Sequence, residues 1–532
     1  MSQVDSRDTG AVVGIDLGTT NSVVATVSER GLQVIRDRNN NALLPSVVAL
    51  VPNGDVQVGR RARERAVIDP CHTIHSAKRL IGRPWSAPDT QQIIAQLPYQ
   101  VTAGQNDETI INTRAGAMSV VEISSRILGQ LRAGAQQWIG RPVTGCVVTV
   151  PANFSDSQRE ATRRAAVGAG MEVLRILNEP TAAAVALGLG DGGSRRVGIF
   201  DLGGGTFDFT VLAIHDGLFE VLATGGEPYL GGDDFDHAIA DRFAHAFLRE
   251  HRVDLNADPE SRAQVLRAAE QAKFVLSAQG MAEGVVPGIA HGPGGREIDL
   301  NYSISRADFE AIIAGQLDRA LAMTERVLAQ ASLRPQDVDE IALVGGSTLI
   351  PVVQRRVKRL FGREPNAEIN PLEVVAIGAA HHAHALWTAA QQPPTATPTT
   401  AAAYAPVETG LLMDVTSHSL GVATFGDNVQ IVIGKNTTMP CEGTRVFSTA
   451  KDGQSYVKIR VCQGEATRFS ESTVLGELTL DNLRPAARGE VQLAVDFIVD
   501  ANGILQVSAR DVATGQHTHA TLCVLGIRNA PA

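Results

Sequence analysis

Cysteine is scarce in this sequence, and positive charge is not in excess. The 532 residues include five cysteines, which are scattered without a Cys-x-x-Cys pair. This spacing argues against a disulfide framework or a zinc knuckle and is typical of proteins from a reducing compartment. Lys and Arg number 47 against 57 Asp and Glu, a formal net charge of −10. A general electrostatic attraction to nucleic acid is therefore not expected.

Long apolar runs are also missing. No stretch of about 18 apolar residues occurs, and residues 1–11 lack the apolar segment of a signal peptide. We therefore expect no membrane association and a cytoplasmic location. Hydrophobic residues make up 44% and charged residues 20%, which is the balance of an ordinary globular protein. The length suggests about three to four domains, or fewer large ones.

The clearest break in composition lies at residues 389–409. Pro, Thr, Ala and Gln dominate this stretch and apolar periodicity is lost, which is typical of a linker that buries too little surface to fold. We predict a first domain over residues 1–388, a linker over 389–413 and a second domain over 414–532.

The two predicted domains differ in their patterns. In the first, residues 119–140 have helical spacing and residues 145–150 form a β-branched run. Ser155 and Gln158 have the spacing of a capping box that begins a helix. This alternation predicts an α/β layered fold. The second domain has short β-rich runs separated by Gly-Asp, Asp-Gly and Asn-Gly turns, which predicts an antiparallel β-sandwich.

One pattern occurs twice in the first domain. Residues 13–24 and 197–212 each contain an apolar strand, an Asp-Leu-Gly sequence, a Gly/Thr turn and a second apolar strand. Asp16 and Asp201 occupy the same place in the two copies. The repeat suggests two related lobes, each of which offers a hairpin to one shared ligand.

A Gly/Thr turn between two strands suits a phosphate group. Its successive backbone N–H groups face an anion, and glycine allows a close approach. The hydroxyls of Thr19, Thr20 and Thr206 add donors, and the preceding aspartate is placed to hold Mg²⁺ through water. One such turn alone is as readily an ordinary β-hairpin. A facing pair predicts a clamp on the phosphate tail of a nucleotide.

A third Gly-rich turn lies within residues 341–357, between an apolar strand and an amphipathic helix. Gly345 and Gly346 would allow a flat ring or a sugar to approach the backbone. Turns of this kind are common in α/β proteins, so an ordinary strand-to-helix connection stays open here.

Several longer segments carry motifs that follow one another along the chain. They are VVGIDLGTTNSVV (12–24), AKRLIGR (77–83), VVTVPANF (147–154), ILNEPTAAAVALGL (176–189), FDLGGGTFD (200–208), LGGDDFD (230–236), LVGGST (343–348), KNTTMP (435–440), VFSTAKDGQS (446–455) and GILQVSARD (503–511). Together they resemble the 70-kDa heat-shock chaperone family of the DnaK type, in the family's order and over nearly the whole chain. The wider superfamily of actin and sugar kinases shares only the phosphate hairpins.

The resemblance implies an α/β fold: a two-lobed, actin-like (ribonuclease H-like) ATPase domain followed by an all-β sandwich. It implies an ATP-dependent molecular chaperone of protein folding and the stress response. Such a chaperone binds extended apolar segments of unfolded proteins and couples their binding and release to ATP hydrolysis by water. The implied cofactors are ATP, Mg²⁺ and K⁺. The implied partners are unfolded peptide segments, a J-domain co-chaperone and a nucleotide-exchange factor.

The resemblance also assigns residues to the ATP site. Lys78 matches the lysine that orients the attacking water and the γ-phosphate, although by residue type alone it reads as a surface charge. The implied catalytic residues are Lys78, Glu179, Asp201 and Thr206. The implied metal site comprises Asp16, Glu179, Asp201 and Asp208, of which Asp16 and Asp208 match potassium positions. The implied nucleotide contacts are Gly18, Thr19, Thr20, Asn21, Gly203, Gly204, Gly205, Thr206, Glu270, Lys273, Ser277, Gly345, Gly346 and Ser347.

Two further sets follow from the resemblance. The coupling set relays the nucleotide state between the domains and comprises Pro151, Arg159, Arg175, Asn178 and Asp414. The peptide-binding set forms an apolar groove with Val457 at its bottom and an arch of Phe425 and Ala450. Its members are Val422, Thr424, Phe425, Phe447, Ala450, Val457 and Ile459. By residue type alone, the arginines read equally as surface charges and the groove residues as sandwich core.

The sequence departs from the family pattern in three places. We expect the helical lid of the family to be absent, because the chain ends about where the sandwich should end. The linker is longer than usual and has Gly410 where a branched residue is common. In the adenine pocket Leu349 replaces a stacking arginine, Phe274 stands nearby, and Leu372 replaces an aspartate. We expect faster peptide exchange and an altered nucleotide affinity.

Two other functions remain open on the sequence alone. A small-molecule kinase of the actin and sugar-kinase superfamily would share the phosphate hairpins, but the C-terminal β-domain and Lys78 argue against it. A nucleotide-regulated scaffold for one dedicated client is favoured by the altered adenine pocket and the long linker. The sequence names neither clients nor an oligomeric state.

Overall fold

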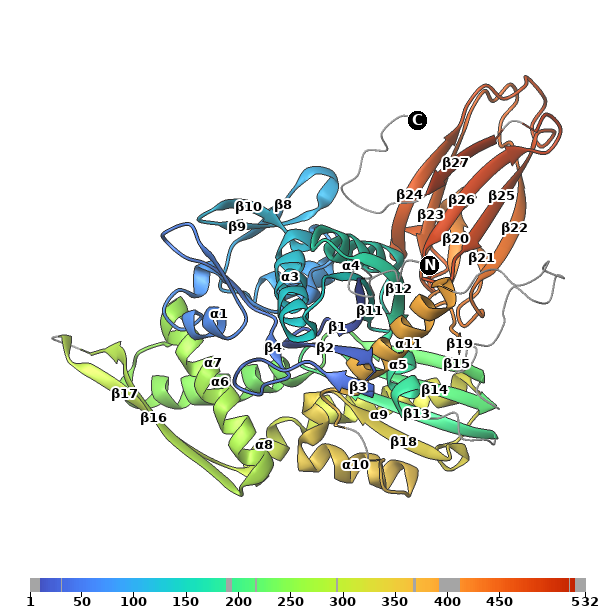
Figure 1. Cartoon of the computed structure of the whole chain (residues 1–532). Helices are drawn as coiled ribbons and strands as arrows, with labels where there is room; N and C mark the ends of the chain where they lie inside the picture. Colours follow the sequence, from blue (N-terminus) through green and yellow to red (C-terminus); the bar gives the residue numbers. More distant parts are fainter. Residues whose placement is uncertain are drawn as a thin grey trace.

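Two large mixed sheets with helices, followed by two four-stranded antiparallel sheets, make up the architecture (Figure 1). A computed structural model describes the chain over residues 10–29, 31–187, 194–215, 218–292, 295–366, 370–391, 412–515 and 517–521. The mixture of helices and strands agrees with the α/β class expected from the sequence. Among these residues, none of the helices is both long and apolar enough to cross a membrane.

The first large sheet has the strand order β12-β11-β1-β2-β3, with β4 beside β2. Strand β1 runs antiparallel to β2 and parallel to β11, and the β-branched residues of these strands are buried on both faces. The strands are β1 (Ala11–Asp16), β2 (Asn21–Ser28), β3 (Gly31–Val34), β4 (Leu44–Pro45), β11 (Val143–Val150) and β12 (Glu172–Asn178).

The second large sheet has the order β18-β13-β14-β15-β19. Its β13–β14 hairpin repeats the antiparallel β1–β2 hairpin of the first sheet, as the repeated sequence pattern predicts. The short strand β19 pairs with the edge strand β15 in parallel. The strands are β13 (Ser194–Leu202), β14 (Phe207–His215), β15 (Leu218–Glu227), β18 (Glu340–Val344) and β19 (Leu412–Met413).

Helices α5 (Glu179–Ala186) and α11 (Val374–Gln391) lie between the two large sheets and share one core with both. Their alanines allow close packing, and two glycines allow the backbones nearly to touch. A Cβ at Gly378 would lie 1.7 Å from the carbonyl oxygen of Ala182, and one at Gly14 would lie 2.0 Å from the backbone nitrogen of Ala380. Small residues at these crossings therefore set the distance between the sheets.

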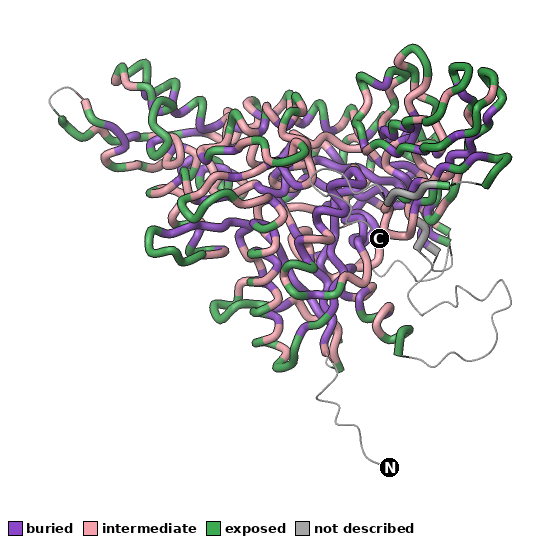
Figure 2. Tube along the Cα trace, turned by 90° about the horizontal axis from the view of Figure 1, so that it is seen from above, coloured by how far each residue is buried: buried purple, intermediate pink, exposed green. Residues whose placement is uncertain are grey.

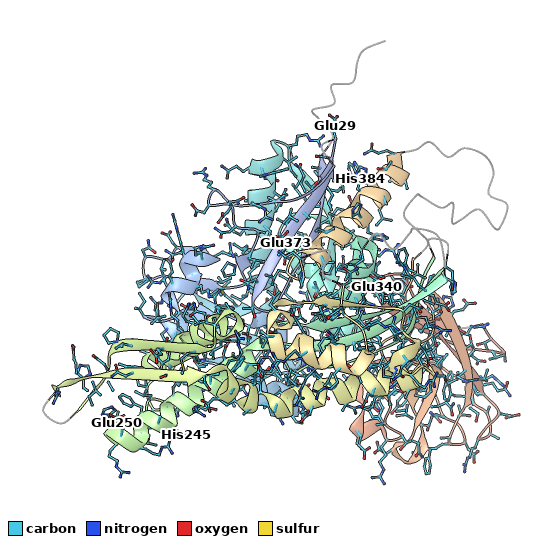
Figure 3. The ribbon with its side chains drawn as sticks, turned by 90° about the horizontal axis from the view of Figure 1, so that it is seen from below. Glu29, His245, Glu250, Glu340, Glu373 and His384 are labelled. Carbon is cyan, nitrogen blue, oxygen red and sulfur yellow. The ribbon has the colours of Figure 1, made fainter. Side chains whose placement is uncertain are left out.

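The remaining helices pack outside the two sheets or on one another. Ser155 accepts a hydrogen bond from the backbone of Gln158, so the predicted capping box begins α4. Helix α6 buries its apolar side and directs His245 and Glu250 outward (Figure 3). Helices α3 (Val120–Ile139) and α4 (Asp156–Gly168) pack on the first sheet and α9 (Ala314–Gln330) packs on the second, with α10 (Pro351–Phe361) beside α9. Helices α6 (Gly232–His251), α7 (Pro259–Ala278) and α8 (Arg306–Ile312) pack on one another, beside the β16–β17 hairpin described below.

Smaller elements extend the two sheet assemblies at the edge where the hairpin turns lie. On the first they are β5 (Val48–Leu50), β6 (Val56–Val58), α1 (Arg60–Arg65), β7 (Thr73–Ile74), α2 (Pro88–Ile94), β8 (Val101–Ala103), β9 (Thr109–Thr113) and β10 (Gly116–Ser119). On the second they are the hairpin strands β16 (Met281–His291) and β17 (Glu297–Ser305), which pack on α7.

Residues 412–521 form the C-terminal region, whose two sheets have the orders β21-β20-β23-β24 and β22-β25-β26-β27. Both sheets contribute to one core that includes Val461, Leu478, Val495 and Phe497. The β-rich runs in the sequence become strands. They are β20 (Leu420–Ala423), β21 (Val429–Ile433), β22 (Cys441–Ser448), β23 (Val457–Gln463), β24 (Thr473–Leu480), β25 (Gln492–Val499), β26 (Leu505–Asp511) and β27 (His517–Thr521).

The expected linker is only partly within the described residues. Helix α11 continues to Gln391, past the boundary expected at residue 388, and β19 follows at Leu412. Gly410 and the rest of the Pro/Thr/Ala tract lie outside the described residues. Figure 2 shows buried chain concentrated at the centre of the sheet assemblies and exposed chain at the tips.

We predict that Gly378→Ala destabilises the protein. The added methyl group would enter backbone space at Ala182, and overpacking of this kind costs about 1–3 kcal/mol. Chemical denaturation measures the change in the free energy of unfolding. Gly129→Ala is the matched control, because nothing lies within 4 Å of a Cβ there and α3 should gain up to about 1 kcal/mol. Equal effects of the two substitutions would contradict the packing argument.

Candidate functional site

The two Gly/Thr hairpin turns of the large sheets touch each other. A Cβ at Gly204 would lie 1.8 Å from the hydroxyl oxygen of Thr20, and one at Gly205 would lie 2.7 Å from the methyl carbon of Thr19. Glycine is required at this approach because any side chain would collide with the opposite turn. The turns that the sequence repeat relates are therefore neighbours in space.

Four carboxylates lie behind these turns with one cation. Asp16 ends β1, Glu179 begins α5, and Asp201 faces Asp208 across the β13–β14 pair. Lys78, in the short 3₁₀ turn Ala77–Arg79, donates from Nζ to Oε1 of Glu179 at 2.6 Å. The two side chains are only 8% and 9% exposed. The cluster therefore carries an excess of buried negative charge.

The excess charge raises the proton affinity of the cluster. Burial, followed by the charge of Glu179, raises the pKa of Asp16 to about 7 against the lowering influence of Lys78. Burial and then the Glu179 charge also raise the pKa of Asp201 and Asp208 well above the ordinary value. Both oxygens of Asp208 are buried without a well-formed hydrogen bond in the described part of the chain, and the backbone N–H of Asn153 is the smallest of the influences on its pKa. No three acidic, histidine or cysteine side chains of the described residues are arranged to ligate one ion directly, so a hard cation such as Mg²⁺ would be held here mainly through water.

A second wall of the site comes from helices α6 and α7 and the Gly-Gly-Ser turn. Lys273 donates from Nζ to Oδ2 of Asp236 at 2.6 Å and to the carbonyl oxygen of Gly232 at 3.1 Å. The hydroxyl of Ser347 donates to the carbonyl oxygen of Gly203 at 2.8 Å, which ties this turn to the second hairpin. Ser277 donates to the carbonyl oxygen of Lys273 at 2.9 Å.

Gly345 and Gly346 occupy this wall for different reasons. Gly345 has a φ of 84° and a Cβ there would lie 2.5 Å from the carbonyl oxygen of Leu202, so the position favours glycine. A Cβ at Gly346 would lie 3.1 Å from Cδ2 of Leu372. The expected apolar replacement at Leu372 thus lies directly beside the turn.

A cavity of about 1510 Å³ opens between the two assemblies. Thr19, Thr20 and Asn21 line it on one side, and Glu270 and Phe274 line it on the other. Lys78 and the four carboxylates are not among its lining residues and lie behind them. Phe274 is 54% exposed, whereas Leu349, which is 44% exposed, is not among the lining residues.

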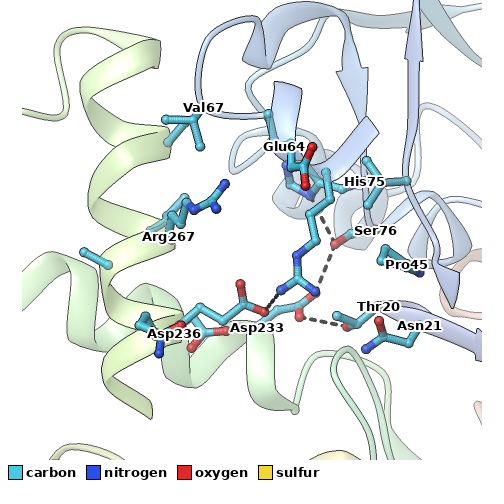
Figure 4. A pocket seen from close by; sticks show the side chains of 18 of the residues that line it. Thr20, Asn21, Pro45, Glu64, Val67, His75, Ser76, Asp233, Asp236 and Arg267 are labelled. Carbon is cyan, nitrogen blue, oxygen red and sulfur yellow. Dashed lines mark hydrogen bonds and ion pairs between the residues drawn. The ribbon is translucent and has the colours of Figure 1, made fainter. Parts of the chain in front are cut away.

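Asp233 joins the two sides of the cavity, and the sequence analysis did not single it out. It accepts hydrogen bonds from the hydroxyls of Thr20 at 3.1 Å and Ser76 at 3.0 Å (Figure 4). Burial alone would raise the pKa of Asp233, but the charges of Arg79 and Lys273 lower it below the ordinary value. The LGGDDFD motif contains this residue, yet its partners are distant in sequence and gave no local signal.

An ion pair spans the cavity between α1 and α7. Arg63 of α1 forms an ion pair with Glu270 of α7. Glu64 follows Arg63 on α1, and Arg267 lies about one turn before Glu270 on α7. At these two positions the acidic residue is on α1 and the basic residue is on α7, the reverse of the ion pair. Figure 4 shows Arg267 extending across the cavity on the side where Glu64 lies. The contact places Glu270, expected at the adenosine, in a link between the two walls.

The C-terminal region contacts the first sheet assembly through the coupling residues. Asn178 donates from Nδ2 to Oδ2 of Asp414 at 2.5 Å and accepts from Arg159 at 2.6 Å. Arg175 donates to the carbonyl oxygen of Ala501 at 3.3 Å. Pro151 directly follows β11, in the loop that leads to α4, and is buried. Arg159, Arg175, Asn178 and Asp414 therefore belong to one contact surface.

Several contacts of this surface involve backbone groups and were not predictable from residue types. The backbone N–H of Ile176 donates to Oδ1 of Asn502 at 3.2 Å. That of Leu505 donates to Oδ1 of Asp156 at 2.7 Å. The Ser417 hydroxyl donates to the carbonyl oxygen of Phe154 at 3.3 Å. His418 lies 3.3 Å from the carbonyl oxygen of Asn153.

The expected groove residues divide into three groups. Val422 and Ile459 lie in the shared core, and Phe447 and Val457 pack partly buried against it. Phe425 is 95% exposed at the 3₁₀ turn Phe425–Asp427, and Ala450 is also exposed. Thr424 donates from its hydroxyl to the carbonyl oxygen of Asn428 at 3.2 Å. The arch residues are thus available to a ligand, whereas the deepest members support the surface from below.

The sequence profile of the Hsp70 protein family matches residues 12–524. The chain belongs to the Hsp70 family. It is 41% identical over 513 residues to the chaperone protein dnaK of Cyanophora paradoxa, covering 96% of this chain and 80% of that protein. It is 42% identical over 513 residues to the chaperone protein dnaK of Cyanidioschyzon merolae, covering 96% of this chain and 81% of that protein.

This Hsp70 chain is therefore an ATP-dependent molecular chaperone and an ATPase, as the resemblance implied. Hsp70 proteins bind ATP with Mg²⁺, and they bind unfolded peptide substrates and co-chaperones. The kinase and the dedicated scaffold are not favoured. The motifs that carried the resemblance were sufficient to identify the family.

We predict that Glu270→Gln accelerates nucleotide release from the Hsp70 cavity. The substitution removes the ion pair with Arg63 between the two walls, and a partly exposed pair contributes about 0.2–1 kcal/mol, which is up to about fivefold in rate. Stopped-flow fluorescence of a labelled ATP analogue measures the rate. Glu310→Gln, which removes an outer pair with Arg355, is the control. An unchanged rate for Glu270→Gln would show that this pair does not hold the cavity closed.

Proposed function

We propose that this Hsp70 chain has a two-lobed, actin-like (ribonuclease H-like) ATPase domain over residues 1–388. A linker over 389–413 and a β-sandwich peptide-binding domain over 414–532 complete the proposal. It is supported by the repeated hairpin in two sheets that share helices α5 and α11. The separate core of the C-terminal region supports the second domain.

The proposed reaction is hydrolysis of ATP by water, positioned by the buried pair Lys78–Glu179. This pair lies behind the two contacting hairpins, and it is the observation that carries the assignment. The backbone N–H groups and hydroxyls of the hairpins, including Thr19, Thr20 and Thr206, would bind the phosphates. Lys78 would hold the attacking water near the γ-phosphate. Phosphoryl transfer needs positioning and charge stabilisation rather than a protein nucleophile.

The carboxylate cluster is the proposed cation site. Asp16, Glu179 and Asp201 would hold Mg²⁺, mainly through water, and Asp16 and Asp208 would hold K⁺. When bound, Mg²⁺ neutralises phosphate charge. The raised pKa values of Asp16, Asp201 and Asp208 and the unpaired oxygens of Asp208 support this proposal, because each of these features is relieved by a cation.

The remaining nucleotide contacts would fix the sugar and base. Glu270, Lys273 and Ser277 on α7 belong to the same wall as the turn of Gly345, Gly346 and Ser347, and Lys273 and Ser347 both lie close to Gly232. Gly18, Asn21 and the glycines 203–205 complete the phosphate side. The exposed ring of Phe274 would contact the base in place of a stacking cation.

Coupling would use the contact surface of Arg159, Arg175, Asn178 and Asp414, with Pro151 behind it. A peptide would cross the C-terminal region under the arch of Phe425 and Ala450 and place one apolar side chain above Val457. A J-domain protein and a nucleotide-exchange factor are the proposed partners. The cytoplasm is the proposed compartment, consistent with the free cysteines Cys71, Cys146, Cys441 and Cys462.

We predict that Lys78→Ala abolishes turnover while ATP remains bound. The substitution removes the one cation of the carboxylate cluster, and loss of such an electrostatic contact costs about 10²–10³ in rate. Single-turnover hydrolysis measures the rate, and equilibrium dialysis measures ATP binding.

Lys458→Ala is the control for this experiment, because Lys458 pairs with Glu477 on the surface of the C-terminal region. It should leave hydrolysis unchanged. A rate for Lys78→Ala within about threefold of the parent, against the about 10²–10³ expected, would refute the proposed role.

We predict that Val457→Phe weakens peptide binding by about tenfold to a hundredfold. Val457 is only partly buried, so a larger side chain can point outward and fill the proposed pocket. A buried apolar side chain of the peptide is worth about 1.5–3 kcal/mol, which gives this range. Fluorescence anisotropy with an extended Leu-rich peptide measures the dissociation constant.

Val474→Phe is the matched control on the neighbouring strand β24, where Val474 is 49% exposed. It should leave peptide affinity unchanged. If Val457→Phe folds and retains the affinity of the parent protein, the peptide binds elsewhere on the C-terminal region.

A further inference from the structure

Asp156 is a buried carboxylate at the contact between α4 and the C-terminal region. It is the first residue of α4 and is only 6% exposed. Its Oδ1 accepts a hydrogen bond at 2.7 Å from the backbone N–H of Leu505, a residue 349 positions later in the chain. Its Oδ2 is buried and has no hydrogen-bond partner in the described part of the chain.

Among the described residues, no cation forms an ion pair with Asp156. The nearest, Arg159, donates to Asn178 at 2.6 Å, to the carbonyl oxygen of Phe154 at 3.3 Å and to that of Ala152 at 3.4 Å. Two like charges add to the cost, because Glu160 lies on the same helix and Asp500 on the facing β25–β26 turn. An ionised Asp156 is therefore poorly accommodated when the two regions are in contact.

We propose that the C-terminal region docks on α4 with Asp156 protonated, so that docking takes up a proton and strengthens as the pH falls from about 8 to about 6.5. The vacant Oδ2 carries the proton, and Oδ1 still accepts from Leu505. This inference deepens the proposed coupling but rests on the contact itself rather than on hydrolysis.

The direction follows from linkage. Burial, more than the charges of Glu160 and Asp500, raises the pKa of Asp156 from 3.8 to about 7, and the Leu505 N–H and Arg159 oppose this shift. Undocking exposes Asp156 and restores an ordinary pKa. The docked form therefore binds more protons, and docking loses stability as the pH rises through about 7.

The two histidines near the contact titrate below this range. Burial lowers the pKa of His418 below 6.5; its charged neighbours are Lys435, Glu465 and Arg159, so acid weakens its contact only below that pH. His382, near Arg175, has its pKa lowered to about 4 by burial. Burial also raises the pKa of Asp414, and the charge of Arg159 and hydrogen bonds from Val415, Asn178 and Thr181 oppose this shift; the Asp156→Asn substitution below separates its contribution from that of Asp156.

Hydrogen–deuterium exchange of the full-length chain tests the proposal. The amide of Ile176 is the reporter, because it donates to Asn502 across the same contact and is not altered by the substitution. After correction for the intrinsic pH dependence of exchange, its protection should rise about fourfold from pH 8 to pH 6.5, as one group with a docked pKa of about 7 requires.

Asp156→Asn separates the charge from the hydrogen bond. The amide oxygen still accepts from Leu505 but carries no charge, so protection of Ile176 at pH 8 should exceed that of the parent by more than about tenfold and should not vary with pH. Asp496→Asn, a partly exposed carboxylate on β25, is the control and should keep the parent profile. His418→Gln should keep the profile above pH 6.5.

Two results would overturn the proposal: a pH-independent protection in the parent chain, or the same fourfold rise in Asp156→Asn. Neither result depends on ATP turnover. A pH-independent profile would leave the hydrolytic role of Lys78 standing, and a failure of the Lys78 prediction would leave the exchange profile standing.

Discussion

The buried ion pair between Lys78 and Glu179 is the interaction on which the proposed nucleotide site depends. Lys78 supplies one positive charge to a cluster that contains Asp16, Asp201 and Asp208 as well as Glu179. Burying so many like charges is costly unless cations complete the balance. The chain accepts this imbalance where two glycine turns meet, at the place where the proposed Mg²⁺ and K⁺ would offset the carboxylate charge. Under this proposal, folding stability and cation binding are linked through one electrostatic constraint.

Local patterns predicted much of the fold. The capping box of Ser155 and Gln158, the helix over residues 119–140 and the two Asp-Leu-Gly hairpins are all found in the structure, because each is specified by neighbouring residues. The β-rich runs became strands for the same reason. The close packing of α11 on α5 was not predicted, since it depends on glycine and alanine meeting from distant parts of the chain.

Site residues were predictable where a long motif contained them and not where a contact created them. Lys78 and Glu179 came from two motifs, and the structure pairs them. Asp233, Arg63 and Asp156 act through partners that are far away in sequence, and two of the contacts at the C-terminal region use backbone N–H groups that no residue pattern encodes. Val422 and Ile459 show the converse, because apolar residues of a groove and of a core have the same pattern.

Because of the short strand β19, the resistance of the C-terminal attachment to force depends on the direction of pulling. The strand adds two residue pairs in parallel to the edge of β15, and Asp414 follows it at once. A force along the strand axis loads both pairs together in shear, whereas a force across the sheet edge peels them apart in turn. A pull along the strand axis, from a peptide bound to the C-terminal region, would therefore be resisted by both residue pairs and be transmitted to the second large sheet. A pull across the sheet edge would separate β19 from β15.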